Sequence, residues 1–209
     1  KKGFRPDFTG GPDDPMERYF DDAKKEILLR VCEKCYGPAT SIILDQLDDG
    51  FCCAFSISGV LLEQMEKWAP DVLDLFRQAA NHTNVEMIGQ TYFHSISSLF
   101  WTMDEFCDQV NLHRELVKDL FGVWPRVFEN TEFLFDNRIA ATVKNLGFEA
   151  CFTEGVDYIL QWRSPNYLYR CAGLPVIMRN FKLSVDIAFR FTCRDWDAWP
   201  LTADRYAHW

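Results

Sequence analysis

Short apolar runs alternate with helical patterns through most of the chain. Four such runs are FCCAFSISG at residues 51–59, VEMIGQTYFHS at 85–95, VFENTEFLF at 127–135 and ACFTEG at 150–155. Apolar residues at helical spacing follow the first three, over 60–81 with a break at Pro70, over 104–122 and over 137–147. Strands that alternate with helices pair in parallel, so the sequence predicts an α/β fold with a parallel sheet curled as a barrel.

The two ends of the chain differ from this repeating part. Residues 1–18 are rich in Pro, Gly and Asp and are expected to be a loop, and residues 19–209 to be a single, partial barrel domain. Two helices divided by Gly37-Pro38 are predicted over residues 19–49. Residues 156–209 are aromatic and irregular, and a new helix starts within PLTADRYAHW. A loop at the start and an unfinished helix at the end lead us to expect a fragment of a longer protein.

Composition and charge exclude several classes of function. The chain has 209 residues and a net charge of −9, without a block of Lys and Arg, which disfavours nucleic acid as a partner. It has no apolar run of about 18 residues, so no membrane span is expected. An acidic chain with 15% aromatic residues suits a neutral substrate. We also expect the protein to be cytoplasmic.

The cysteines and histidines do not form a pattern typical of a metal site. The eight cysteines lie mostly in apolar segments and are expected to be reduced thiols. Cys32 and Cys35 form a C-x-x-C, but within a helical pattern that lacks a second pair of ligands. His94 stands apart from the other histidines, so neither a metal nor another cofactor is expected.

Polar residues gather where the predicted strands end, which is the edge that binds ligands in parallel β/α folds. Together with aromatic and charged residues of the later loops they have the makeup of a carbohydrate site. The strand-end residues are Ser56, Ser58, Gln90, Thr91, His94, Asn130, Thr131, Glu132, Thr153 and Glu154, and the later ones are Trp162, Arg163, Asp186 and Trp196.

Glu132 is the candidate for chemistry, because it interrupts an apolar strand near its end. The alternative is a structural carboxylate paired with Arg126, Arg138 or Arg163. Glu154 precedes Gly155 and is interpreted as a hydrogen-bonding residue of a turn.

Seven ordered blocks resemble one known family. They are FSISGVLLEQMEKWAPDVLDLF, VEMIGQTYFHS, VFENTEFLFDNRIA, FTEGVD, WRSPNYLY, LSVDIAFRF and WPLTADRYAHW, and in this order they resemble glycoside hydrolase family 57, in its α-amylase-like branch. The resemblance implies an incomplete (β/α)7 barrel of the glycoside hydrolase/deacetylase type. It also implies cleavage or transfer of α-glucans with retention of configuration and without a metal.

The resemblance assigns roles to individual residues. Glu132, in the segment NTE, would be the nucleophile, and Asn130 would hold its carboxylate or a sugar hydroxyl. His94 and Trp162 would line the subsites, and Arg163 and Asp186 would bind substrate. Gln90 stands where many relatives have a carboxylate.

Two parts of the family pattern do not occur in these 209 residues. The first is an opening strand that ends in His-Gln-Pro. The second is a strand that carries the general-acid aspartate, and it is expected after PLTADRYAHW. A retaining mechanism requires two carboxyl groups about 5 to 5.5 Å apart. We therefore expect an α-amylase-like hydrolase of maltodextrin, starch or glycogen as the full-length protein, and an inactive chain when these residues stand alone.

Other functions remain open at this point. A 4-α-glucanotransferase would use the same intermediate, and a non-catalytic α-glucan-binding module would keep only the aromatic cleft. A metal-dependent carbohydrate deacetylase is a further alternative, since such enzymes have a related barrel.

Overall fold

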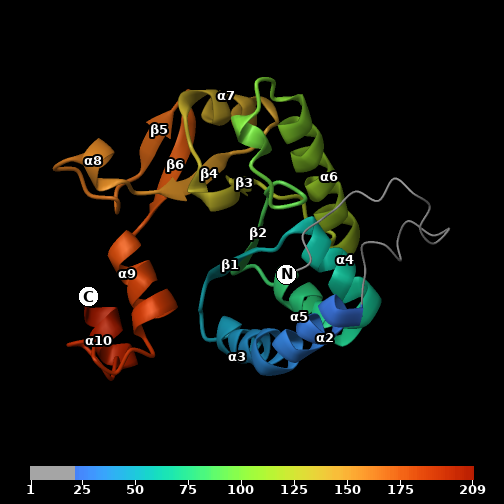
Figure 1. Ribbon diagram of the computed structural model, residues 1–209, viewed down its shortest axis with the longest axis vertical. Coiled ribbons are helices and arrows are strands. Elements are labelled where there is room, and N and C mark those ends of the chain that lie inside the picture. Colours follow the sequence, from blue (N-terminus) through green and yellow to red (C-terminus); the bar gives the residue numbers. More distant parts are fainter. Residues whose placement is uncertain (1–21) are drawn as a thin grey trace. The chain divides into compact units, whose positions relative to one another are not determined.

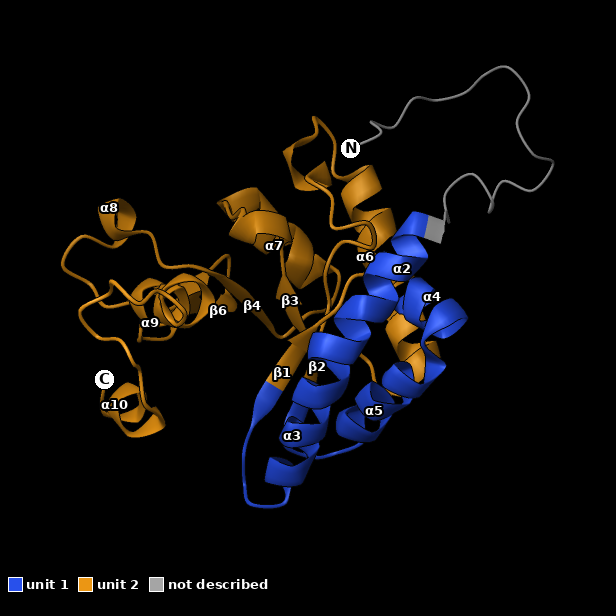
Figure 2. Cartoon of the chain, turned by 60° about the horizontal axis from the view of Figure 1, so that its bottom comes forward, with its two compact units in different colours: residues 1–53, 60–85 blue, residues 54–59, 86–209 orange. Residues whose placement is uncertain are grey.

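The computed structural model describes residues 22–209, so the loop expected over residues 1–18 lies outside the described part. Within it, the chain forms two compact units (Figure 2). The first comprises residues up to 53 together with 60–85, and the second comprises residues 54–59 and 86–209. The polar strand ends belong to the second unit.

The first unit is mainly helical. It contains α2 (Asp22–Val31), α3 (Gly37–Leu47), most of α4 (Gly59–Trp68) and α5 (Pro70–Ala80). The predicted break at Pro70 is confirmed. Its fully buried side chains include Leu62, Met65 and Leu73.

Gly37-Pro38 stands at the start of the second of the two predicted helices, and no loop separates α2 from α3. A π-helical turn, Cys32–Tyr36, joins α2 to α3, and the backbone N–H of Gly37 bonds to the carbonyl of Cys32. Proline has no N–H to donate and is tolerated in the first turn of a helix. The wider turn therefore ends one helix while Pro38 starts the next.

The strands confirm the predicted parallel pairing. β1 (Cys53–Ser56) and β2 (Val85–Ile88) form a two-stranded sheet. A second sheet has the order β3-β4-β6-β5, with β3 (Val127–Glu129) parallel to β4 (Ala150–Glu154) and β4 parallel to β6 (Leu174–Arg179) (Figure 1). A parallel bridge between Gly89 and Phe128 joins the end of β2 to β3.

Two helices and the second sheet share one apolar core. α6 (Asp104–Phe121) ends at the left-handed Gly122, as predicted, and α7 (Asn137–Asn145) is capped by Asp136. The rings of Phe106 and Phe128 meet edge to face, with their centroids 5.6 Å apart. The buried cluster consists of Phe106, Val110, Phe128, Ile139, Val143, Phe148, Cys151 and Leu174.

The carboxyl-terminal region has more regular structure than the sequence suggested. It contains α8 (Asp157–Leu160), β5 (Tyr169–Cys171), β6, α9 (Phe181–Val185) and the helix that was expected near the end, α10 (Ala203–His208). Ala172 and Gly173 both have positive φ and connect β5 to the antiparallel β6. Two left-handed residues between strands are typical of a tight hairpin. Between residues 22 and 209 no helix is both long enough and apolar enough to cross a membrane.

A buried histidine connects the ends of β1 and β2. His113, on α6, is completely buried, with Nε2 2.8 Å from the carbonyl oxygen of Ile57 and Nδ1 accepting from the backbone N–H of Gln90 at 3.4 Å. Burial lowers the pKa of His113, and the hydrogen bond to Ile57 opposes that shift. The neutral ring, with its proton on Nε2, satisfies both backbone groups.

We expect His113→Gln to lower the free energy of unfolding by about 1–3 kcal/mol near neutral pH, because buried backbone groups lose a partner. In the unfolded chain the histidine binds a proton more readily than in the folded protein. The contribution of His113 to the free energy of unfolding is therefore present above the ordinary histidine pKa of about 6.5. It is lost as the pH falls toward the lowered pKa of His113 in the folded protein. The stability difference between parent and variant should shrink between about pH 7.5 and pH 5.5.

Urea unfolding at several pH values measures this difference. His208→Gln, on the exposed α10, controls for the loss of a histidine elsewhere. A difference between parent and His113→Gln that stays constant over the pH range would contradict the role given to His113.

Candidate active site

The parallel register brings polar strand ends to one edge. Phe128 pairs with Cys151, and Cys151 with Val176, so β3, β4 and β6 run in step toward Glu129, Glu154 and Arg179. The Gly89 bridge puts Gln90 at the same edge. This is the edge at which the sequence placed the candidate site.

Glu132 lies beyond β3 and does not interrupt the strand, which corrects the sequence-based interpretation. β3 ends at Glu129, and a 3₁₀ turn, Thr131–Phe133, follows. Within this turn Glu132 has a φ of 55° and ψ of 24°, and its side chain is 76% exposed. The turn thus carries the carboxylate from the end of the strand into solvent.

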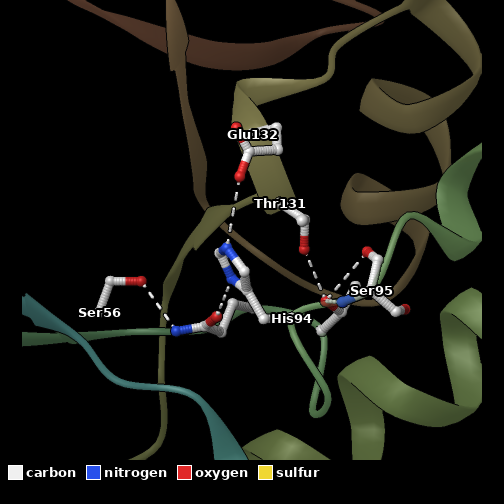
Figure 3. Close-up of polar contacts among 7 residues, drawn as sticks. Ser56, His94, Ser95, Thr131 and Glu132 are labelled. Carbon is white, nitrogen blue, oxygen red and sulfur yellow. Dashed lines mark hydrogen bonds and ion pairs between the residues drawn. The ribbon is translucent and has the colours of Figure 1, made fainter. Parts of the chain in front are cut away.

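Glu132 Oε1 lies 3.8 Å from His94 Nε2 (Figure 3). Figure 3 shows the imidazole of His94 reaching up from the loop after β2 toward the carboxylate. The structure therefore brings together two of the predicted site residues.

The backbone around this pair is strained. His94, Glu132 and Phe133 all have positive φ, a region that costs a non-glycine residue roughly 1–3 kcal/mol and is enriched at functional sites. Local bonds hold Phe133 in place: its N–H donates to the carbonyl of Asn130 at 2.9 Å and its carbonyl accepts from Thr153 Oγ1 at 2.9 Å. The guanidinium of Arg179 lies 4.6 Å from the centre of the Phe133 ring.

A buried hydroxyl pair joins the two loops that carry His94 and Glu132. Thr91 Oγ1 and Thr131 Oγ1 are 2.9 Å apart, and Thr91 Oγ1 also accepts from the N–H of Ser95 at 3.0 Å (Figure 3). Thr91 and Thr131 are almost completely buried. The loops after β2 and β3 are thus linked directly beneath the exposed pair.

Gln90 connects His94 to the end of β1. Its carboxamide lies 3.2 Å from His94 Nδ1 and 3.0 Å from Ser56 Oγ, and the residue is 4% exposed. Gln90 is therefore a buried neighbour of the exposed imidazole.

Asn130 is buried beneath the turn. Its amide group donates to Ser98 Oγ and to the carbonyl of Leu134, both at 2.9 Å. Its Oδ1 is buried and has no hydrogen-bond partner among residues 22–209. These contacts fix the loop on both sides of Glu132.

Three further predicted residues lie in the carboxyl-terminal region. Trp162 is 87% exposed, and Arg163 donates from Nε to the carbonyl of Leu160 at 3.1 Å. Asp186 is buried and lies 3.3 Å from Arg190 Nη1. The contacts of these three residues are made within the carboxyl-terminal region.

Glu154 behaves as a turn residue. Its Oε1 accepts from the N–H of Gly155 at 3.0 Å, and its other oxygen is paired with Arg179. The charge of this carboxylate is thereby balanced by Arg179 at the end of β4.

The three arginines proposed as structural partners of Glu132 have other partners. Arg126 pairs with Glu86 and Glu149, Arg138 donates to the carbonyls of Ser98 and Phe100, and Arg163 donates to Leu160. Glu132 instead lies beside His94.

Sequence reasoning missed Glu129, the carboxylate within β3. It lines a cavity of about 530 Å³ together with Ser56 and Phe152. Burial raises the pKa of Glu129, while His94, the Ser56 hydroxyl and Arg179 oppose that shift. The alternation of Val127, Phe128 and Glu129 was the available signal, since Phe128 enters the core and its two neighbours point into the cavity.

The described residues show no metal site, since no group of three or more His, Cys, Asp or Glu side chains among them could hold an ion. Cys32 is buried and Cys35 exposed, and all eight cysteines are free thiols. Burial raises the pKa of Cys151 to about 12, so this thiol stays protonated near neutral pH.

Comparison with solved structures supports the barrel. A 4-alpha-glucanotransferase from Thermococcus litoralis matches 79% of this chain with a TM-score of 0.68 and 19% identity, over 27% of its own length. The alpha-amylase AmyC from Thermotoga maritima matches 81% with a TM-score of 0.63 and 13% identity, over 44% of its length. At these identities the likeness concerns the fold, which is part of a (β/α)7 barrel.

Comparison of sequences goes further. A curated protein of Methanocaldococcus jannaschii, named "Putative alpha-amylase", is 48% identical over 196 residues, which are 92% of this chain and 42% of that protein. The chain thus spans less than half the length of this relative. The model of the family described as "Glycosyl hydrolase family 57" matches residues 12–209. The chain belongs to glycosyl hydrolase family 57.

Proposed function

We propose that this chain carries the nucleophile of a retaining α-glucan hydrolase of the α-amylase type, and that Glu132 is that nucleophile. The observation that carries the proposal is the state of the Glu132 carboxylate. It is 76% exposed at the ligand-binding edge, has a histidine rather than an arginine beside it, and is held in a strained backbone. A structural carboxylate has no need of such a conformation.

In the proposed reaction a Glu132 oxygen attacks the anomeric carbon of a glucosyl unit. The bond from that carbon to the leaving glycosidic oxygen breaks, and a covalent glucosyl-enzyme forms. Water then attacks the same carbon, gives a proton to the group that protonated the leaving oxygen, and releases Glu132 as a carboxylate. The acid that protonates the leaving oxygen is, by resemblance to the family, an aspartate carboxyl-terminal to Trp209, so activity is expected of the full-length protein.

The proposed substrate is an α-glucan such as maltodextrin, starch or glycogen. Exposed aromatic rings support it, since pyranose rings stack on such faces. Trp162 is 87% and Trp101 97% exposed, and both lie on loops of the second unit. We include His94, Asn130, Trp162, Arg163 and Asp186 in the proposed substrate site. A cytoplasmic location belongs to the same proposal and is supported by the eight free thiols.

We expect Glu132→Gln in the full-length protein to lower turnover of a maltooligosaccharide by about 10³-fold or more, because the amide cannot form the glucosyl ester. Glu149→Gln removes another exposed carboxylate of the same unit and should retain activity. Steady-state rates measure the turnover of both variants. Mass spectrometry of the trapped glucosyl-enzyme shows whether the covalent intermediate forms. Activity of Glu132→Gln close to that of the parent would refute the assignment.

Transfer to a sugar would use the same intermediate, because a glucan hydroxyl can replace water as the attacking group. We propose hydrolysis as the main reaction and expect maltotriose to give glucose and maltose. Chromatography of the products tests this directly. Products longer than maltotriose would assign the protein as a 4-α-glucanotransferase instead.

A binding module without catalysis would retain the affinity and lose only the turnover. We expect the full-length protein both to bind maltoheptaose in a calorimeter and to degrade it. Binding of the unchanged sugar over a long incubation would favour the non-catalytic alternative.

A further inference from the structure

One buried carboxamide, that of Gln90, lies between the end of β1 and His94. Gln90 follows the bridge residue Gly89 and is 4% exposed, so its amide must be satisfied within the protein. One end of the amide faces three groups, Ser56 Oγ at 3.0 Å, the N–H of Ile57 at 3.1 Å and the N–H of Ser58 at 3.1 Å. The other end faces His94 Nδ1 at 3.2 Å.

The backbone settles which end is the oxygen. The N–H groups of Ile57 and Ser58 can only donate, so an acceptor has to face them. The Oε1 of Gln90 therefore points to Ser56, Ile57 and Ser58, and its NH₂ group points to His94. The reverse orientation would set amide hydrogens against two backbone N–H groups.

Glu129 also interacts with the Ser56 hydroxyl, but this does not change the orientation of the Gln90 amide. The Ser56 hydroxyl is also a hydrogen-bond partner of Glu129 and has one proton to give. Even when that proton goes to Glu129, the two backbone N–H groups remain on the Gln90 oxygen. The backbone of residues 57 and 58 is itself held by His113, which contacts the carbonyl of Ile57 at 2.8 Å.

The orientation of the amide determines the tautomer of His94. An NH₂ group only donates, so Nδ1 has to accept, and a neutral imidazole that accepts at Nδ1 carries its proton on Nε2. Nε2 is the atom 3.8 Å from Glu132 Oε1. We propose that Gln90 is a positioning residue that holds His94 as the Nε2–H tautomer, so that a neutral donor faces the Glu132 carboxylate.

The consequence for the reaction rests on the proposed function. A neutral N–H orients one carboxylate oxygen and leaves the negative charge of Glu132 available for attack. The opposite tautomer would place a lone pair against that oxygen and turn the carboxylate away.

Nuclear magnetic resonance of the full-length protein labelled with ¹⁵N-histidine tests the tautomer directly. At a mildly alkaline pH we expect His94 to show a protonated Nε2 and an unprotonated Nδ1. The opposite pattern in the unmodified protein overturns the proposal, whether or not any variant folds.

Three variants separate Gln90 from the other neighbours of His94. Glu132→Gln should keep the Nε2–H signature, because Gln90 and not Glu132 imposes it. Ser56→Ala should also keep it, since the two backbone donors remain. Gln90→Glu should move the proton to Nδ1, while Gln78→Glu, the same change on an exposed position of α5, should leave it on Nε2. A tautomer that changes in Glu132→Gln, or stays in Gln90→Glu, overturns the proposal.

Turnover of a maltooligosaccharide gives the functional consequence. We expect Gln90→Glu to lose about 10- to 100-fold in turnover, by analogy with the loss that follows removal of a partner that orients a metal ligand. If the tautomer switches and turnover stays at the parent level, the positioning role is refuted. If Glu132→Gln is active while the tautomers behave as expected, the proposed function fails and the assignment of Gln90 stands.

Discussion

The parallel pairing of short strands is the constraint on which the rest of the structure depends. β3, β4 and β6 run in one direction, and the Gly89 bridge adds the end of β2 to them. Side chains far apart in the sequence therefore meet at one edge of the sheet. The buried cluster around Phe128 is apolar. Without this common direction His94 and Glu132 would have no reason to face each other.

A second layer of order comes from backbone groups that the strands leave unpaired. The neutral ring of His113 forms hydrogen bonds with one backbone carbonyl and one backbone N–H. The carboxamide oxygen of Gln90 accepts from two more backbone N–H groups. Both side chains are buried and uncharged in these roles. The polar residues below the edge thus satisfy backbone groups that the strands leave without a partner.

The sequence predicted most of this arrangement, with limits that have physical causes. Alternating apolar runs revealed the parallel fold, and Gly122 and Pro70 marked real boundaries. The end of β3 was misplaced, because an apolar run does not show where a chain leaves the sheet, and the hairpin at Ala172-Gly173 was missed. Gln90 and Glu129 were not recognised as neighbours of His94, since the contacts of a buried polar group depend on strand register.

The hydroxyl bond between Thr91 and Thr131 has a consequence for thermal motion. The loops that carry His94 and Glu132 come from different strands, and independent fluctuations would vary the gap between the two side chains. The buried 2.9 Å contact makes a displacement of one loop draw the other with it. The two loops should therefore fluctuate together, so that the separation of carboxylate and imidazole varies less than the position of either.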